Sequence, residues 1–176
     1  AGGPISYAVN DRARMVRAAV RPLPKENLTM YQRILVATDG SKLSKKAVDD
    51  AIALAASLGA ELIALKVVPR YPQSYFEGSI PLSLEDVARV EKQWADDAHE
   101  IVEAVKRAGA AREVKVKPII ARSDVVSDAL IAAAKKHKAD LIVMASHGRK
   151  GVKRLLLGSE TQQVLTHSEI PVLVLR

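Results

Sequence analysis

The sequence predicts a single α/β domain in which helices cover both faces of one open, parallel, five-stranded sheet. Three observations lead to this prediction. The chain has 176 residues, which is close to the size of one domain. From Ile34 onwards, short apolar runs alternate with segments whose apolar residues recur at helical spacing. Most of these runs are continuous, as in strands that are buried on both faces, which favours parallel strands joined by right-handed crossovers.

The first 29 residues differ in character from the rest of the chain. They hold five basic and two acidic residues, and Pro22 and Pro24 end any short basic helix over residues 12–21. Met30 stands directly before the first strand and is a natural beginning for the folded part. We therefore expect residues 1–29 to be an added leader or an N-terminal extension outside the core, and residues 30–176 to be the domain.

The beginning of the domain predicts two strands joined by a helix. Residues 34–37 form the first buried strand, and residues 38–41 have the composition of a turn. Ser44 is the expected cap of the helix, and Gly59 ends it. Residues 62–68 form the second strand. The helix is expected from six apolar residues at helical spacing: Ala47, Val48, Ala51, Ile52, Ala55 and Leu58.

The middle of the chain predicts a loop, a long helix and a strand. Residues 69–82 contain three prolines, and Ser83 with Asp86 makes a capping box after them. The helix ends at Gly109, and residues 114–120 form the third strand. One face of the helix is apolar, with its tryptophan expected in the core: Val87, Val90, Trp94, Ala98, Ile101, Val102 and Val105.

The last part of the domain predicts two more strands and two helices. Residues 129–137 are the end of the third helix, and residues 140–145 form the fourth strand. Gly158 and Ser159 open the fourth helix, and residues 171–175 form the last strand. Because this strand is too apolar for a free sheet edge, we expect a second copy of the chain to cover it.

Composition and charge exclude several function classes. The chain has no cysteine, so it has no disulfide, thiolate nucleophile or cysteine-ligated metal. Of its net charge of +7, residues 30–176 carry +4, which is compatible with an anionic small ligand. Only 3% of its residues are aromatic, which argues against a stacking platform for nucleic acid. Apolar runs stay far below the ~20 residues of a membrane-spanning helix, and no secretory signal is present. We expect a cytoplasmic protein without a membrane or nucleic-acid partner.

The carboxyl ends of the first and fourth strands carry the candidate binding residues. Residues 38–41 and 146–148 are small and polar, and ligands of parallel sheets bind beyond such strand ends. A basic loop containing glycines then leads to the helix start at Gly158 and Ser159. Glycines let backbone N–H groups approach an anion, and a helix N-terminus attracts phosphate. This arrangement predicts phosphate binding, with positive charge from Arg149, Lys150, Lys153 and Arg154.

The loop has neither the Walker A spacing nor a Gly-x-Gly-x-x-Gly fingerprint. Instead, four segments in this order resemble the universal stress protein family: ILVATDGS (34–41), ADLIVMASHG (139–148), LGS (157–159) and PVLVL (171–175). The combination is specific, and the resemblance covers about residues 32–176.

The resemblance implies a Rossmann-like fold of the adenine nucleotide α-hydrolase-like type, with strand order 3-2-1-4-5. It implies a homodimer formed through residues 172–175 and an ATP-binding regulatory module of the stress response, acting on a protein partner that the sequence does not identify. AMP, ADP or a cyclic nucleotide are alternative ligands. Mg²⁺ could accompany the nucleotide, with Asp39 and Glu160 as the acidic residues nearest the loop. We assign no catalytic or metal-ligating residue, and we expect hydrolysis to be slow if it occurs.

Nucleotide-binding members of the family carry Gly, two residues, Gly, nine residues, then Gly-Ser/Thr. Gly148 and the pair Gly158 and Ser159 fit this motif, but Ala145 replaces the first glycine. Alanine permits ordinary strand conformations, so we expect the site to be retained. Carried over, the resemblance assigns adenine and ribose contacts to Ala37, Thr38, Asp39, Val67, Met144 and Ala145, with Asp39 accepting from the ribose. It assigns phosphate contacts to Gly148, Arg149, Lys150, Gly151, Gly158, Ser159, Glu160 and Thr161.

Alternatives stay open at this point. An enzyme, either a weak ATPase or an adenylyl-transfer enzyme, is one of them, and a nucleotide-free dimeric scaffold is another because Ala145 departs from the motif. Asp39 could simply form an Asx-turn, and Gly158 with Ser159 could be an ordinary helix cap. His147 is more simply a hydrogen-bonding loop residue than a general acid or a metal ligand.

Overall fold

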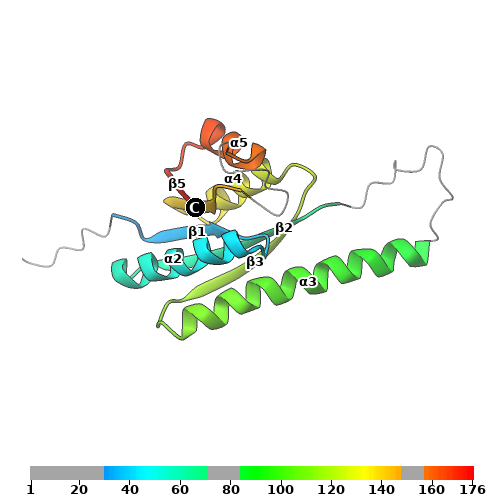
Figure 1. Ribbon diagram of the computed structural model, residues 1–176, viewed down its shortest axis with the longest axis horizontal. Helices are drawn as coiled ribbons and strands as arrows, with labels where there is room; N and C mark the ends of the chain where they lie inside the picture. Colours follow the sequence, from blue (N-terminus) through cyan, green and yellow to red (C-terminus); the bar gives the residue numbers. More distant parts are fainter. Residues whose placement is uncertain (1–29, 71–83, 148–156) are drawn as a thin grey trace, which may run out of the picture.

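The computed structural model describes residues 30–70, 84–147 and 157–176. Five parallel strands form one sheet in the order β3-β2-β1-β4-β5, which confirms the predicted topology (Figure 1). The elements are β1 (Arg33–Ala37), α2 (Lys42–Leu58), β2 (Glu61–Val68), α3 (Leu84–Ala110), β3 (Val116–Arg122), α4 (Val126–Lys136), β4 (Leu141–Ala145), α5 (Ser159–His167) and β5 (Val172–Leu175).

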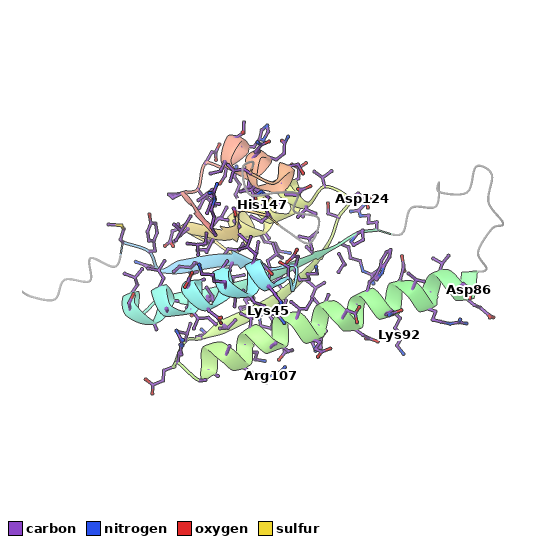
Figure 2. All side chains as sticks on the ribbon, viewed as in Figure 1. Lys45, Asp86, Lys92, Arg107, Asp124 and His147 are labelled. Atoms are coloured by element: carbon purple, nitrogen blue, oxygen red, sulfur yellow. The ribbon has the colours of Figure 1, made fainter. Side chains whose placement is uncertain are left out.

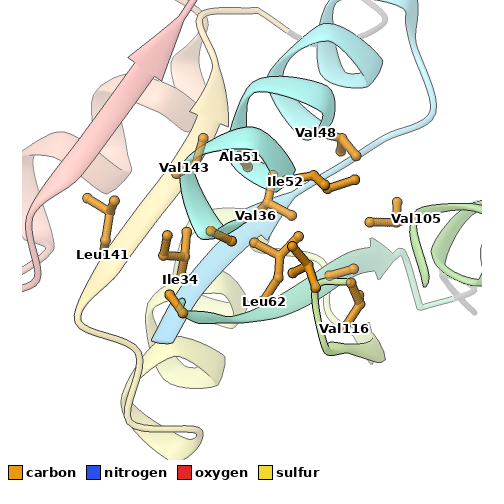
Figure 3. Close-up of a cluster of buried hydrophobic side chains, with 14 residues drawn as sticks. Ile34, Val36, Val48, Ala51, Ile52, Leu62, Val105, Val116, Leu141 and Val143 are labelled. Carbon is orange, nitrogen blue, oxygen red and sulfur yellow. The ribbon is translucent and has the colours of Figure 1, made fainter. Parts of the chain in front are cut away.

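The sheet lies between two helical layers, with α2 and α3 on one face and α4 and α5 on the other (Figure 1). Successive residues of a strand point to opposite faces, so each buried strand serves both cores. Val36 packs with residues of α2 and α3 in the cluster drawn in Figure 3. Leu35 packs with Leu130 of α4 and Val164 of α5 in the second cluster. Burial on both faces explains the continuous apolar runs.

The sheet register brings the ends of β1 and β4 side by side. Val36 lies opposite Val143, and both strands end within two residues of this pair. Strand β1 also pairs with β2 on its other side, with Val36 opposite Ala64. The connections leave β1 and β4 toward opposite faces of the sheet, so the strand order reverses between them. This is the position at which such sheets bind ligands.

The start of α2 differs from the prediction. Ser41 is the N-cap, and its side chain accepts from the N–H of Ser44 at 3.2 Å. Ser44 is buried inside the first turn, where its hydroxyl donates to the carbonyl oxygen of Ser41 at 3.1 Å. The expectation that Ser44 caps the helix was therefore wrong, because two serines three residues apart both match the cap preference. Gly59 ends the helix as predicted, with φ of 65°.

The boundaries of α3 and β3 are shifted from the prediction. The helix runs one residue past Gly109, and β3 covers residues 116–122 rather than 114–120. The N–H of Val114 donates back to the carbonyl oxygen of Gly109 at 2.9 Å, so Val114 belongs to the helix-ending turn. Trp94 is half-buried rather than in the core, because the N-terminal part of α3 extends beyond the sheet (Figure 1). Ser83, the predicted cap, lies outside the described residues.

Asp140 joins the beginnings of β1 and β4. Its carboxylate accepts from the backbone N–H groups of Gln32 and Arg33, at 2.8 and 3.0 Å. The residue therefore precedes β4, which begins at Leu141, one residue later than expected.

Among the described residues, no helix is both long and apolar enough to cross a membrane.

Candidate functional site

The turn after β1 is held together by buried hydroxyl groups. Thr38 is buried, and its N–H donates to the carbonyl oxygen of Leu65 on β2 at 3.0 Å. Its Oγ1 accepts from the N–H of Gly40 at 3.2 Å and lies 3.2 Å from Oγ of Ser44. These contacts fix the backbone of the predicted adenine-binding segment to the adjacent strand and to α2.

Asp39 follows Thr38 and forms the Asx-turn that its position allows. Its Oδ1 accepts from the N–H of Ser41 at 2.9 Å, and Gly40 between them has φ of 83°. A non-glycine residue would be strained at this φ. On the neighbouring strand, Nζ of Lys66 donates to the carbonyl oxygen of Asp39 at 3.4 Å. The turn is therefore rigid and has a cation beside it, and the ribose role of Asp39 stays a prediction.

The end of β4 is buried and regular. Met144 and Ala145 are both buried, and neither has a positive φ. Ser146, which is 1% exposed, donates its N–H to the carbonyl oxygen of Leu175 on β5 at 2.7 Å. Alanine at position 145 therefore fits a backbone that does not need glycine.

The start of α5 is bonded directly to this strand end. The N–H of Gly158 donates to the carbonyl oxygen of Ser146 at 2.9 Å. The hydroxyl of Thr161, which is buried, donates to the carbonyl oxygen of Ala145 at 3.2 Å. The first N–H groups of a helix have no intrahelical acceptor, and they carry a partial positive charge. The first turn of α5 therefore presents donors that suit an anion.

Packing against the described part of the chain does not require a glycine at position 158. Its φ of −61° is accessible to any residue. A Cβ atom at this position would lie 3.4 Å from the carbonyl oxygen of Ser146 and 3.6 Å from Cα of His147, which is ordinary contact. Neither the backbone conformation nor the neighbouring atoms explain a glycine here. A bare Cα instead keeps the approach to the start of α5 open.

Glu160 connects α5 to α4. Its Oε2 accepts from the N–H of Ser127 in the first turn of α4 at 2.9 Å. The N-cap residue of α4, Val125, makes no side-chain hydrogen bond to the helix, so Glu160 supplies the missing acceptor. The carboxylate that we predicted beside the phosphates is thus engaged with a neighbouring helix start.

His147, labelled in Figure 2, follows the buried strand end. Its Cα lies 3.6 Å from the position that a Cβ atom of residue 158 would take. Its Nδ1 is 3.1 Å from Oγ of Ser146. Its Nε2 is shielded from solvent and has no hydrogen-bond partner among the described residues. A buried polar atom without a partner is unfavourable, so this nitrogen fits contact with a bound group.

The remaining predicted site residues lie partly at the strand ends and partly outside the described residues. Ala37 and Val67 are half-buried at the ends of β1 and β2, packed against the cluster that contains Met144. Ser159 is exposed at the first position of α5. Gly148, Arg149, Lys150 and Gly151 lie outside the described residues. Within the described ranges, no group of three or more histidine and acidic side chains could hold a metal ion.

Sequence reasoning missed two residues that build the site, Lys66 and Ser127. It included Ser146 among the candidate residues 146–148, and it named Ser44 only as a helix cap and not as a contact of Thr38. The contacts of Lys66 and Ser127 join segments 27 and 33 residues apart, so no local pattern could reveal them.

Known proteins of one family are similar to this chain in sequence and in fold. The model of the universal stress protein family matches residues 30–176. The universal stress protein MJ0531 of Methanocaldococcus jannaschii is 35% identical over 153 residues, covering 86% of this chain and 84% of that protein. The solved universal stress protein UspA of Lactobacillus plantarum has a TM-score of 0.71 at 26% identity, covering 83% of this chain and 98% of that chain. A universal stress protein solved in complex with cAMP has a TM-score of 0.62 at 29% identity, covering 83% of this chain and 97% of that chain.

Proposed function

The chain belongs to the universal stress protein family, and from this membership we propose that it is an adenine-nucleotide-binding regulatory module. The nucleotide lies across the carboxyl ends of β1 and β4. The observation that carries the proposal is Gly158, whose missing side chain is explained neither by its backbone conformation nor by the described residues around it. A solved relative that binds cAMP supports an adenine nucleotide as the ligand class.

The phosphates of the proposed ligand meet the first turn of α5. Backbone N–H groups of Ser159 and Glu160 point from the start of a helix that two hydrogen bonds anchor to β4. Thr161 contributes through this anchoring, since its hydroxyl donates to the strand end. The basic loop adds charge through Arg149 and Lys150, with Gly148 and Gly151 as the proposed points of close backbone approach.

The adenine and ribose lie nearer to the ends of β1 and β2. Ala37, Val67 and Met144 offer apolar contacts, and the buried Thr38 offers backbone groups. A carboxylate has about four acceptor positions. Asp39 can therefore keep its Asx-turn and also accept from ribose hydroxyls. Ala145 lies in regular strand conformation, which supports retention of the site despite the missing motif glycine.

We propose binding rather than rapid catalysis, with ATP as the preferred ligand. Fast phosphoryl transfer needs an oriented nucleophile and stabilisation of the developing charge. Glu160, one of two acidic residues close to the loop, already accepts from Ser127, so it is poorly placed to orient water. Mg²⁺ bound with the nucleotide would have Asp39 and Glu160 as the nearest carboxylates.

The regulatory output follows from the position of β5. This strand pairs with β4 on one side, and Leu173 is 38% exposed. We propose that β5 pairs with β5 of a second copy to form a homodimer in the cytoplasm. The carbonyl oxygen of Leu175 accepts from the N–H of Ser146, which lies at the candidate site. One hydrogen bond therefore links the proposed nucleotide site to the proposed dimer edge. A protein partner in the stress response then binds the dimer surface, whose form depends on the bound nucleotide.

The test is nucleotide content followed by calorimetry. Protein purified without added nucleotide is denatured, and the supernatant is analysed by anion exchange. We expect an adenine nucleotide, and we expect ATP, ADP, AMP or cAMP to bind the stripped protein with measurable heat. Folded protein that contains no nucleotide, and gives no heat with any of the four at millimolar concentration, would leave only the dimeric scaffold. Rapid loss of bound ATP with Mg²⁺ would favour the ATPase.

A further inference from the structure

A cleft lies at the amino ends of the strands, at the end of the sheet opposite to the candidate nucleotide site. It has a volume of about 510 Å³ and is formed where β1, β2 and β3 begin. Strand β2 alone spans eight residues, or roughly 25 Å at ~3.3 Å per residue, between this end and the candidate nucleotide site. The charged or titratable side chains that line the cleft are Arg33, Glu61, Lys106, Lys115, Lys117 and His137.

The cleft has an excess of positive charge, with four cationic side chains against one carboxylate. The carboxylate of Glu61 is paired with Nζ of Lys115 at 2.5 Å, and this pair lowers the pKa of Glu61. Nζ of Lys106 lies 3.5 Å from Glu103 on its own helix. The side chains of Arg33 and Lys117 have no carboxylate at ion-pair distance within the described ranges. These two cations are therefore not held in a close ion pair, although both also act at longer range on the carboxylate of Glu61.

Both of these cations contact the same residue at the end of α4. Nη1 of Arg33 donates to the carbonyl oxygen of His137 at 3.4 Å, and Nζ of Lys117 lies 3.4 Å from its Nδ1. Partial burial and then the charges of Lys117 and Lys136 lower the pKa of the His137 imidazole. Burial and the neighbouring cations thus both favour the neutral form of the His137 imidazole. An anion bound in the cleft would offset the charge of these cations and raise the pKa of His137.

We propose that this cleft binds a small, multivalent oxyanion of the phosphate class, held between the guanidinium of Arg33 and the ammonium of Lys117. Lys115 and Lys106 also line the cleft, each beside a glutamate with which it forms an ion pair. A planar guanidinium donates to two phosphate oxygens at once, and an ammonium adds a point charge. The volume is in the range of small-ligand sites. The site is independent of the proposed nucleotide site and would remain if that proposal failed.

The histidines allow the two sites to be observed separately. The full chain has four histidines, of which His137 lies in the cleft and His147 lies at the nucleotide site. We propose NMR titration of histidine-labelled protein with and without inorganic pyrophosphate or tripolyphosphate. Ionic strength must be matched with NaCl, because salt alone screens the neighbouring cations and raises a lowered pKa. The exposed His167 serves as the internal control.

We expect both polyphosphates to raise the pKa of His137, whereas the NMR signals of the exposed His167 should not respond to either of them. Lys117→Gln or Arg33→Gln should weaken pyrophosphate binding about tenfold, in line with the loss of one charge-assisted hydrogen bond. Lys92→Gln removes the same charge from a side chain that projects from α3 into solvent (Figure 2), and it should change the affinity less than twofold. Both cleft substitutions replace surface side chains, and circular dichroism verifies their fold.

Three results would overturn the proposal. The first is an unchanged His137 pKa at millimolar tripolyphosphate. The second is an equal loss of affinity in Lys92→Gln, which would mean attraction by net charge alone. The third is equal binding of sulfate and pyrophosphate, which would remove the preference for phosphate. A comparison of pyrophosphate with a phosphomonoester such as glycerol phosphate then separates a free inorganic ligand from a phosphorylated metabolite.

Discussion

Thr161 donates its hydroxyl hydrogen to the carbonyl oxygen of Ala145, at 3.2 Å, and so joins the first turn of α5 to the last residue of β4. A second bond, from the N–H of Gly158 to Ser146, makes the connection rigid. The start of the helix is therefore positioned before any ligand arrives. Such preorganisation lowers the cost of ordering groups on binding. The backbone carbonyl of Ala145, and not its methyl group, makes the connection.

Ala145→Gly tests whether the departure from the family motif matters. Because the carbonyl oxygen that accepts from Thr161 is retained, we expect ATP affinity to be unchanged or higher by calorimetry. Glycine inside a strand should lower the free energy of unfolding by roughly 0.5–1 kcal/mol, which a denaturant titration measures. A clear loss of ATP affinity in folded protein would show that the loop is placed wrongly in the proposed site.

Gly158→Val tests the phosphate position. A Cβ atom at this position makes only ordinary contacts, so the variant should fold. Its γ-carbons would occupy the approach to the start of α5. Loss of two charge-assisted hydrogen bonds, at ~1.5–3 kcal/mol each, predicts a fall in ATP affinity of about 100-fold or more. Gly158→Ala is the control with a smaller side chain. We expect a smaller fall in ATP affinity and the same thermal midpoint of unfolding as the unchanged protein. Retained affinity in the valine variant would count against the site.

Glu160→Gln tests the electrostatics of the helix start. Glutamine keeps an oxygen that can accept from the N–H of Ser127, but it removes a negative charge beside the proposed phosphates. We expect ATP affinity without Mg²⁺ to rise a few-fold by calorimetry. Glu160→Ala should lower stability by about 1 kcal/mol as well, because the cap of α4 is lost. Weaker binding of Glu160→Gln in Mg²⁺ would instead indicate that this carboxylate helps to hold the ion.

The sheet could be predicted because its determinants are local. A continuous apolar run such as residues 34–36 is fully buried, and its length and continuity favour a central parallel strand. Helix caps were less certain because Ser41 and Ser44 have equal intrinsic preference, and the choice depends on Thr38 across the turn. The bond from Ser127 to Glu160 depends on packing between α4 and α5, which no local pattern encodes. Roles of site residues such as Asp39 stay predictions because one carboxylate can serve both a turn and a ribose.

Gly109→Ala tests the packing of α3 against β3. The added Cβ atom would collide with Cγ2 of the buried Val116 and crowd the carbonyl oxygen of Val114. Overpacking costs ~1–3 kcal/mol, which exceeds the modest helical preference of alanine at a helix end. We expect a lower free energy of unfolding in a denaturant titration. The double variant Gly109→Ala with Val116→Ala should be more stable than the sum of the single effects predicts, since the collision is removed. Additive effects would argue against this contact.

Leu173→Glu tests whether β5 is the dimer edge. Leu173 is 38% exposed on a strand that pairs with β4 along one side only, and a charge there should prevent pairing with a second copy. Sedimentation should show a dimer for the unchanged protein and a monomer for the variant at micromolar concentration. The matched control is Leu165→Glu on α5, where a leucine 43% exposed takes the same charge away from the edge and should leave the dimer intact. If both variants remain dimeric, the interface lies elsewhere. If Leu165→Glu alone dissociates, the dimer forms through α5 and the proposed coupling between Ser146 and Leu175 loses its basis.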